Sequence, residues 1–169
     1  MDNGLVDADA LPQDLTGALV VAVEDSPAAR EALRWAASLA TALDRTLHVV
    51  TVWNFVRGRA PQDENPDGTP NKARWQAEAE RGLQALVAEE VSTPVQLLAL
   101  HGNTVPTLLA VAAVADHLVV GTRGRGGFAG LLLGSTSDQL VRYAGCPVTV
   151  VGRGDTGRGD TGRGDTGRG

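Results

Sequence analysis

The chain has 169 residues, of which 43% are hydrophobic, enough for one domain with a core but too few for two. Its formal net charge is −5, and Lys72 is its single lysine. Nucleic acids and anionic membrane surfaces attract basic proteins, so this charge argues against both as the main partner. The single cysteine, Cys146, excludes a disulfide within the chain and a cysteine-based metal site, and favours a reducing compartment.

The two ends of the chain differ in composition from its middle. Residues 1–14 carry four acidic side chains without hydrophobic periodicity, and residues 153–169 continue a GRGDT repeat. We expect two solvated tails around one domain at residues 15–152. No basic segment followed by an apolar stretch opens the chain, and no apolar run reaches membrane-spanning length, so we expect a soluble cytoplasmic protein.

The first predicted element is the apolar run 18–23, which is short, β-branched and without alternation. Such a run is typical of a strand that is buried on both faces of a parallel sheet. Ser26 and Pro27 then predict the start of a helix, because serine caps first-turn amides and proline suits the first helical position. Apolar residues recur on one face of this helix: Ala32, Leu33, Ala36, Ala37, Ala40 and Leu43.

Strands and helices alternate along the rest of the chain. Strands are predicted at 47–53, 94–100, 118–120 and 147–151, and helices at 73–90, 104–115 and 135–144. A long connection rich in proline, glycine and charge, 54–71, precedes the second helix. Alternation of this kind requires right-handed crossovers. The sequence therefore predicts a single α/β domain of the Rossmann-like class, with an open parallel sheet and helices on both faces.

A glycine-rich segment, 121–135, joins the fourth predicted strand to the last helix. Glycine lets backbone amides approach an anion closely, and the unpaired amides of the helix start add to the attraction. With the hydroxyls of Ser135 and Thr136 and two arginines, the segment predicts a cradle for phosphates. The structural alternative is a glycine turn without a ligand, in which Ser135 and Asp138 form a helix cap.

Two standard phosphate-binding motifs do not fit this segment. Gly124, Gly126 and Ala129 have the spacing of the dinucleotide fingerprint, but they follow the fourth strand and lack a later acidic residue for the ribose. The mononucleotide P-loop places a lysine just before its Ser or Thr, and no lysine precedes Ser135. Dinucleotide binding and lysine-assisted phosphoryl transfer therefore lose support.

The segment instead resembles the signature of the universal stress protein family. ATP-binding members have Gly, two residues, Gly, nine residues, and then Gly followed by Ser or Thr. Gly121, Gly124, Gly134 and Ser135 match this spacing. The stretches VVAVEDS, LHVVTVW, HGN and CPVTVV extend the resemblance over about residues 18–151.

The resemblance implies five strands in the order 3-2-1-4-5. It also implies a bound adenine nucleotide (ATP, ADP or AMP), together with which Mg²⁺ would bind. It implies phosphates on the glycine loop, adenine near the main chain of Val52, and an acidic residue near the sugar. The implied binding residues are Glu24, Val52, Gly121, Gly124, Arg125, Gly126, Gly127, Gly134, Ser135 and Thr136. A homodimer paired through the strand from Pro147 to Val151 is also implied, and it would cover an apolar edge.

Glu24 and Asp25 depart from the family pattern, which has Asp at the first position and often Gly at the second. Two adjacent acids beside an anion site predict lower affinity or an altered nucleotide preference. Three functions stay open. They are a nucleotide-binding regulatory module of the stress response rather than a dedicated enzyme, a dimeric interaction protein that has lost the nucleotide, and a slow ATPase or nucleotidyl-transfer enzyme.

Other chemistry-bearing residues are predicted to be structural. His48, His101 and His117 share neither a helical face nor the spacing of metal ligands. The three tryptophans fall on separate predicted elements, so they are expected to pack rather than to form a platform for a base. The sequence contains no Gly-x-Ser-x-Gly elbow, which leaves a hydrolase with little support.

Overall fold

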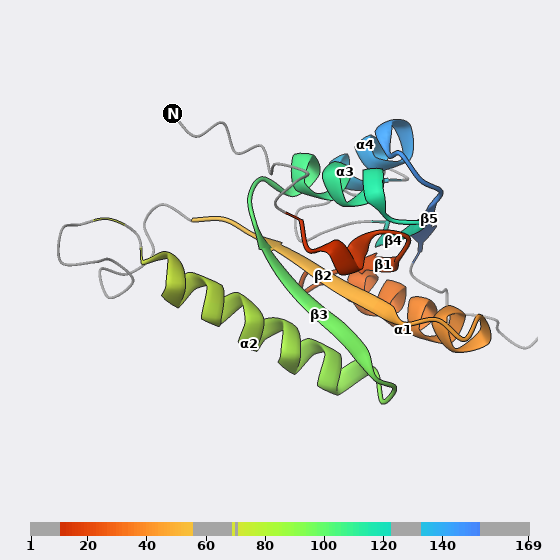
Figure 1. Ribbon diagram of the computed structural model, residues 1–169, viewed down its shortest axis with the longest axis horizontal. Helices are drawn as coiled ribbons and strands as arrows, with labels where there is room; N and C mark the ends of the chain where they lie inside the picture. The colour runs from red at the N-terminus through yellow and green to blue at the C-terminus, as the bar shows by residue number, and fades with distance from the viewer. Residues whose placement is uncertain (1–10, 56–68, 70, 123–132, 153–169) are drawn as a thin grey trace, which may run out of the picture.

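The computed structural model describes residues 11–55, 69, 71–122 and 133–152 (Figure 1). Within them lies one sheet of five parallel strands in the order β3-β2-β1-β4-β5. The strands are β1 (Leu19–Ala22), β2 (Leu47–Trp53), β3 (Val95–His101), β4 (His117–Gly121) and β5 (Val148–Val151). The helices are α1 (Pro27–Ala42), α2 (Lys72–Glu90), α3 (Thr104–Val114) and α4 (Ser135–Tyr143), with a 3₁₀ turn, η2 (Gln13–Leu15), before β1. The predicted fold class and strand order are confirmed.

The start of α1 follows the sequence prediction. Ser26 has an extended backbone and its hydroxyl accepts a hydrogen bond from the Ala29 N–H at 3.2 Å, while Pro27 is the first helical residue. The end of the helix differs from the prediction. Because α1 ends at Ala42, Leu43 lies beyond its buried face and is 53% exposed.

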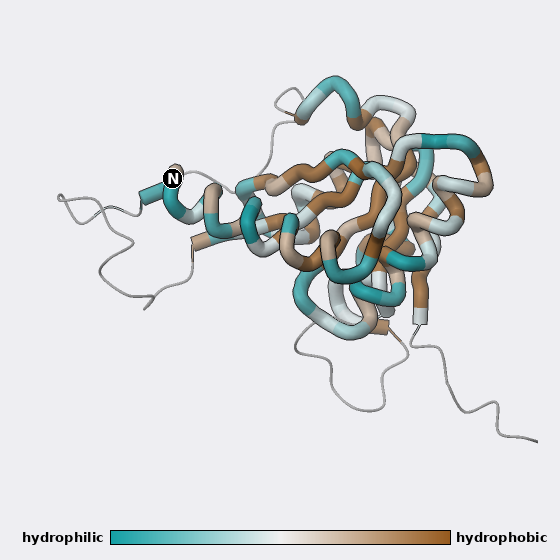
Figure 2. Tube along the Cα trace, turned by 90° about the horizontal axis from the view of Figure 1, so that it is seen from below, coloured by the Kyte–Doolittle hydropathy of each residue, from teal (hydrophilic) through white to brown (hydrophobic). Residues whose placement is uncertain are grey.

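β1 is buried on both of its faces, which explains the apolar run without alternation. Leu19 and Val21 belong to a hydrophobic cluster with α1 and α2, whereas Val20 points to the opposite face and joins a cluster with α3 and α4. Figure 1 shows the two helix pairs on opposite sides of the sheet. In Figure 2 the hydrophobic positions are concentrated in the strands between the helices.

The winding of the chain reverses at β1. From β1 the chain moves outward to β2 and β3, and it then returns to the other side of β1 to add β4 and β5. The connections that leave β1 and β4 therefore go to opposite faces of the sheet. A crevice forms at the carboxyl ends of these two strands, which is where open parallel sheets bind their ligands.

The core also includes residues ahead of β1. The sequence prediction places residues 1–14 in a solvated tail, whereas Leu11 is buried and Leu15 is 0% exposed. Leu15, the last residue of η2, and Leu11, just ahead of this turn, both belong to the hydrophobic cluster that also contains residues of α3 and α4. The core therefore includes both leucines, which cover apolar surface that would otherwise be exposed.

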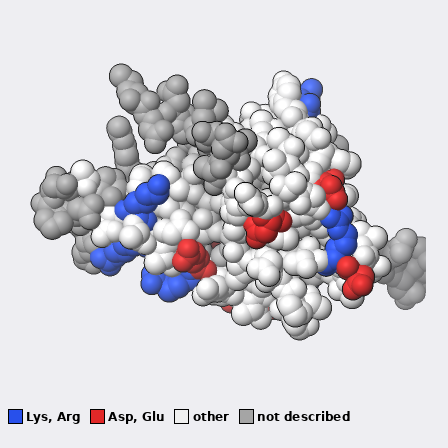
Figure 3. Space-filling model, in the orientation of Figure 1, with Lys and Arg blue, Asp and Glu red and all other residues white. Residues whose placement is uncertain are grey.

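Charged residues of both signs are mixed on the described surface. On the face drawn in Figure 3, acidic and basic side chains lie in small groups, and the described residues there form no extended basic surface. The ion pair between Arg45 and Asp116, 3.0 Å apart, is one example of neighbouring side chains of opposite charge. None of the helices in the described part of the chain has the length and apolar character needed to cross a membrane.

The burial of Leu15 predicts a large loss of stability on truncation. Leu15→Ala should lower the free energy of unfolding by about 2–5 kcal/mol, because it opens a cavity under η2. Leu43→Ala makes the same chemical change at an exposed position and should cost about 0.5 kcal/mol or less. Urea denaturation of both variants checks this, and equal losses would show that the η2 turn is not part of the core.

Candidate functional site

The carboxyl ends of β1 and β2 bring two of the predicted site residues together. Ala22 pairs with Val50, and the Val23 N–H donates to the Val50 carbonyl at 2.8 Å, so the alignment continues past the end of β1. Glu24 and Val52 each lie two residues beyond this last pair of positions, near the carboxyl edge of the sheet. Both residues line the same cavity.

Ser26 binds Glu24 in addition to capping α1. The Ser26 hydroxyl accepts from the Ala29 N–H and donates to Oε1 of Glu24. Ser26 is buried and Glu24 is partly buried, so these contacts are partly shielded from water. The side chain of Glu24, longer than that of aspartate, therefore reaches the hydroxyl two residues ahead.

Gly121 ends β4 where this strand passes closest to α1. A Cβ atom at this position would lie 2.8 Å from the carbonyl carbon of Ala28, 2.9 Å from its oxygen and 3.0 Å from the Ala29 nitrogen. These are backbone atoms of a helix and cannot move aside easily. The close packing of β4 against the first turn of α1 therefore requires glycine at this position, whether or not a ligand binds.

Thr122 and Gly134, near the two ends of the glycine-rich segment, are hydrogen-bonded to each other. The Thr122 carbonyl accepts from the Gly134 N–H at 2.7 Å and from the Ser137 hydroxyl at 2.9 Å. The Thr122 N–H donates to Val151 at the end of β5, at 2.9 Å. The segment thus starts and ends at one point beside β4. The Gly134 amide, predicted to contact phosphate, already donates to a protein oxygen.

The amino end of α4 lies directly after this closure. Ser135 is exposed and Thr136 is partly buried. The Asp138 N–H donates to the Gly134 carbonyl at 2.9 Å, so the backbone amides of Ser135 and Thr136 precede the first helical hydrogen bond. Within the described residues, no side chain caps α4. This helix start therefore offers backbone donors and the positive end of a dipole to an anion.

The structural alternative for Ser135 is wrong in its geometry. A cap formed by Ser135 and Asp138 requires Ser135 to precede the helix, whereas Ser135 is its first residue and Gly134 holds the cap position. Asp138 pairs instead with Arg142 at 3.0 Å, one turn further along. The remaining predicted site residues lie outside the described part of the chain: Gly124, Arg125, Gly126 and Gly127.

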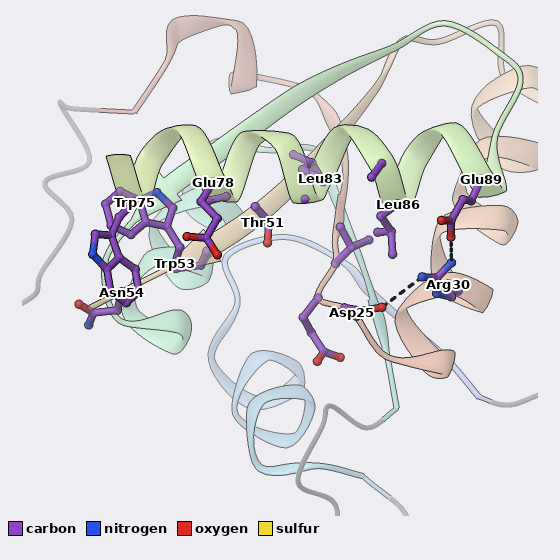
Figure 4. Close-up of a pocket in the computed structure, with 16 residues that line it drawn as sticks. Asp25, Arg30, Thr51, Trp53, Asn54, Trp75, Glu78, Leu83, Leu86 and Glu89 are labelled. Atoms are coloured by element: carbon purple, nitrogen blue, oxygen red, sulfur yellow. Dashed lines mark hydrogen bonds and ion pairs between the residues drawn. The ribbon is translucent and has the colours of Figure 1, made fainter. Parts of the chain in front are cut away.

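A cavity of about 650 Å³ opens beside Glu24 and Val52, in the size range of small-molecule sites (Figure 4). The loop after β1 and the end of β2 form one wall, and α2 forms the other through apolar residues such as Leu83 and Leu86. The charged side chains that line the cavity are Glu24, Asp25, Arg30, Glu78 and Glu89. The sequence does not predict α2 as a wall of the cavity, because the α2 residues that line it are ordinary helix residues without a motif.

Aromatic side chains close one end of this cavity. Phe55 packs edge-on against both Trp53 and Trp75, with ring centroids 5.6 and 5.7 Å apart, and the His101 ring packs against Trp53 at a tilt of 49°, with centroids 4.4 Å apart. The Trp53 Nε1–H donates to Gln76 of α2 at 2.7 Å. Trp53 and Trp75 thus both pack against Phe55 and also line the cavity, whereas Trp35 of α1, predicted to pack as well, is 41% exposed.

The other two histidines are also engaged in local contacts. The His117 Nε2 atom lies 2.8 Å from the Thr149 hydroxyl, and the His48 Nε2 atom lies 3.8 Å from the Asp14 carboxylate. The described residues contain no group of three or more His, Cys, Asp or Glu side chains that could hold a metal ion. For Cys146, burial raises the pKa of the thiol, which lowers its reactivity.

The fold and this edge of the sheet define an open, doubly wound α/β domain with a ligand crevice at the winding reversal. A sequence profile of the universal stress protein family matches residues 17–152. The chain belongs to this family. A universal stress protein of Mycobacterium tuberculosis H37Rv, Rv2623, is 36% identical over 145 residues, which cover 79% of this chain and 46% of that protein. The chain thus spans about half the length of this curated relative.

Solved structures share the fold at lower identity. UspA from Lactobacillus plantarum superposes with a TM-score of 0.59 at 23% identity, over 80% of this chain and 97% of the other. A universal stress protein in complex with cAMP has a TM-score of 0.55 at 24% identity, over 81% and 97%. One from Archaeoglobus fulgidus in complex with dAMP has a TM-score of 0.50 at 19% identity, over 81% and 98%.

Two glycine substitutions should have opposite effects on stability. Gly121→Ala should lower the free energy of unfolding by about 1–3 kcal/mol, because the added methyl overlaps the backbone of α1. Gly82→Ala, in the middle of α2, meets nothing within 4 Å and should raise stability by up to about 1 kcal/mol through helix propensity. Thermal and urea denaturation of both variants measure this. A neutral Gly121→Ala would contradict the close contact between β4 and α1.

Proposed function

We propose that this protein is a regulatory module of the stress response that binds an adenine nucleotide at the edge formed by β1, β2 and α4. The observation that carries the proposal is the amino end of α4, whose first amides lie at the winding reversal without a side-chain cap among the described residues. Membership of the universal stress protein family and the cAMP and dAMP complexes of two proteins of the same fold support adenine as the base.

In this proposal the phosphates bind at the first turn of α4. The backbone amides of Ser135 and Thr136 donate to phosphate oxygens, and the two hydroxyls add further donors. Adenine lies against the end of β2 near Val52, and the Glu24 carboxylate accepts from a ribose hydroxyl. The Ser26 contact holds Glu24 at the end of β1, so the carboxylate is preorganised for this role.

We propose binding rather than catalysis as the main activity. Each described histidine has a contact elsewhere: His117 with Thr149, His48 beside Asp14, and His101 against Trp53. None of these three histidines is therefore placed to act as a general base at the amino end of α4. Mg²⁺, where it takes part, would arrive with the nucleotide, since the described residues hold no metal-binding cluster of their own.

We further propose a cytoplasmic homodimer that pairs through β5. β5 is at the edge of the sheet and pairs with β4 on one side only. Its valines at positions 148, 150 and 151 are only partly buried. An edge of this kind is usually covered in soluble proteins, and a second copy of the same strand would cover it.

A charge placed at the first residue of α4 tests the nucleotide site. Ser135→Glu should weaken ATP binding by about tenfold or more, because the new carboxylate repels the phosphates. The helix itself should remain stable, since an acidic residue is favourable at a helix amino end, by about 0.3–1 kcal/mol. Isothermal titration calorimetry with ATP and AMP measures the affinities.

Gln139→Glu is the matched control, because it adds the same charge one turn further along the exposed surface of α4. It should weaken ATP binding clearly less than Ser135→Glu does, because its carboxylate lies about one turn further from the phosphates. Equal affinity of the wild type and Ser135→Glu would refute the placement of the phosphates. Failure of the wild type to bind any adenine nucleotide would favour an interaction protein without a ligand, and steady phosphate release would indicate an ATPase.

A further inference from the structure

Asp25 presents a charge problem for the proposed nucleotide site, on which the following inference rests. Glu24 and Asp25 are consecutive, both line the cavity, and both lie at the end of β1, where an anionic ligand is expected. The Asp25 side chain is 66% exposed. A carboxylate in this position repels a polyphosphate unless another group neutralises it or turns it away.

Arg30 binds the Asp25 carboxylate from the first turns of α1. Its Nη2 lies 3.1 Å from Oδ1 of Asp25, and its Nη1 lies 2.7 Å from carboxylate oxygens of both Glu89 and Glu90 at the end of α2. Figure 4 shows Asp25 pointing toward Arg30, and Arg30 pointing toward Glu89. One guanidinium thus joins the loop after β1 to the far end of α2.

The two glutamates hold Arg30 in place. The Glu90 side chain is only 12% exposed and also binds Arg34, so it is a fixed partner. The hydrogen bond from Arg30 lowers the pKa of Glu90, which keeps that carboxylate charged. Arg30 cannot follow Asp25 toward the ligand without breaking two short contacts with α2. Its planar guanidinium, with donors on both terminal nitrogens, suits this role better than the single ammonium of lysine.

We propose that Arg30 is a positioning residue for the nucleotide site, which holds the Asp25 carboxylate toward α2 and so allows a polyphosphate to bind beside two consecutive acids. Arg30 does not contact the nucleotide in this arrangement. Its effect on affinity grows with the number of phosphates on the ligand, because it acts through the charge of Asp25. The same contacts join the loop after β1 to α2. A shift of α2 would therefore change both the shape of the cavity and the electrostatic potential at the phosphates.

A double-mutant cycle between Arg30 and Asp25 tests this inference. In Arg30→Met, ATP should bind about tenfold more weakly, AMP should lose less, and adenosine should change by less than about twofold. Adding Asp25→Asn to this variant should restore the ATP affinity. Asp25→Asn alone should change the ATP affinity by less than about twofold, since Arg30 already holds the Asp25 carboxylate toward α2 in the wild type. Calorimetry on the full chain measures all four proteins with the three ligands.

Arg34→Met is the matched control, because Arg34 shares Glu90 with Arg30 but pairs with Glu31 and Glu90 rather than with Asp25. It removes one positive charge nearby and should leave the preference for ATP over adenosine unchanged. Arg30→Gln keeps a donor for the two glutamates without the charge, and it replaces Arg30→Met in the cycle if thermal denaturation shows that the methionine variant folds poorly.

Three results would overturn the inference. They are equal ATP affinity with and without Arg30, failure of Asp25→Asn to restore binding, and tighter ATP binding by about tenfold in Asp25→Asn alone. A wild-type chain that binds adenosine but gains nothing from phosphates would also overturn it. A wild-type chain that binds no adenine nucleotide would instead refute the proposed function, and the inference with it.

Discussion

The burial of β1 on both of its faces is the constraint from which the rest of this structure follows. Three consecutive apolar residues of the strand, Leu19 to Val21, are almost fully buried, so each face of the sheet needs its own layer of helices. Covering both faces requires the chain to wind outward in one direction from β1 and then in the other. The crevice at the carboxyl end of β1 is a geometric result of that reversal, and it exists whatever ligand enters it.

The loops at this crevice are tied down by contacts that serve the fold first. Ser26 caps α1 and also binds Glu24. Thr122 accepts from both Gly134 and Ser137, which fixes the start of α4 beside the end of β4. These hydrogen bonds hold a carboxylate and a helix terminus in place without a ligand. A site built in this way loses little conformational entropy on binding.

Much of the fold was predictable because its signals are local. The apolar run at 18–23, the Ser26 and Pro27 pair, and the alternation of strand and helix each depend on neighbours within one turn or one strand. The signature spacing likewise pointed to the edge where Glu24, Val52 and the start of α4 lie. Nothing in that spacing distinguishes a residue that contacts a ligand from one that contacts the protein.

The features that were missed depend on contacts between residues far apart in the chain. Arg30 and Glu89 are 59 positions apart, and no pattern in either helix indicates that they meet. The wall of the cavity formed by α2 and the cluster of Phe55 with two tryptophans are of the same kind. The burial of Leu11 and Leu15 was missed because a 3₁₀ turn of three residues is too short to produce a periodic signal.

The close contact between β4 and α1 affects how family signatures are interpreted. Since Gly121 is required for packing, natural selection on folding alone would retain it after nucleotide binding had been lost. The first glycine of the signature is therefore a poor diagnostic for a functional site in this protein. Sequence surveys that sort such domains into binding and non-binding groups would be better based on positions without a packing role, such as the exposed Ser135 at the amino end of α4.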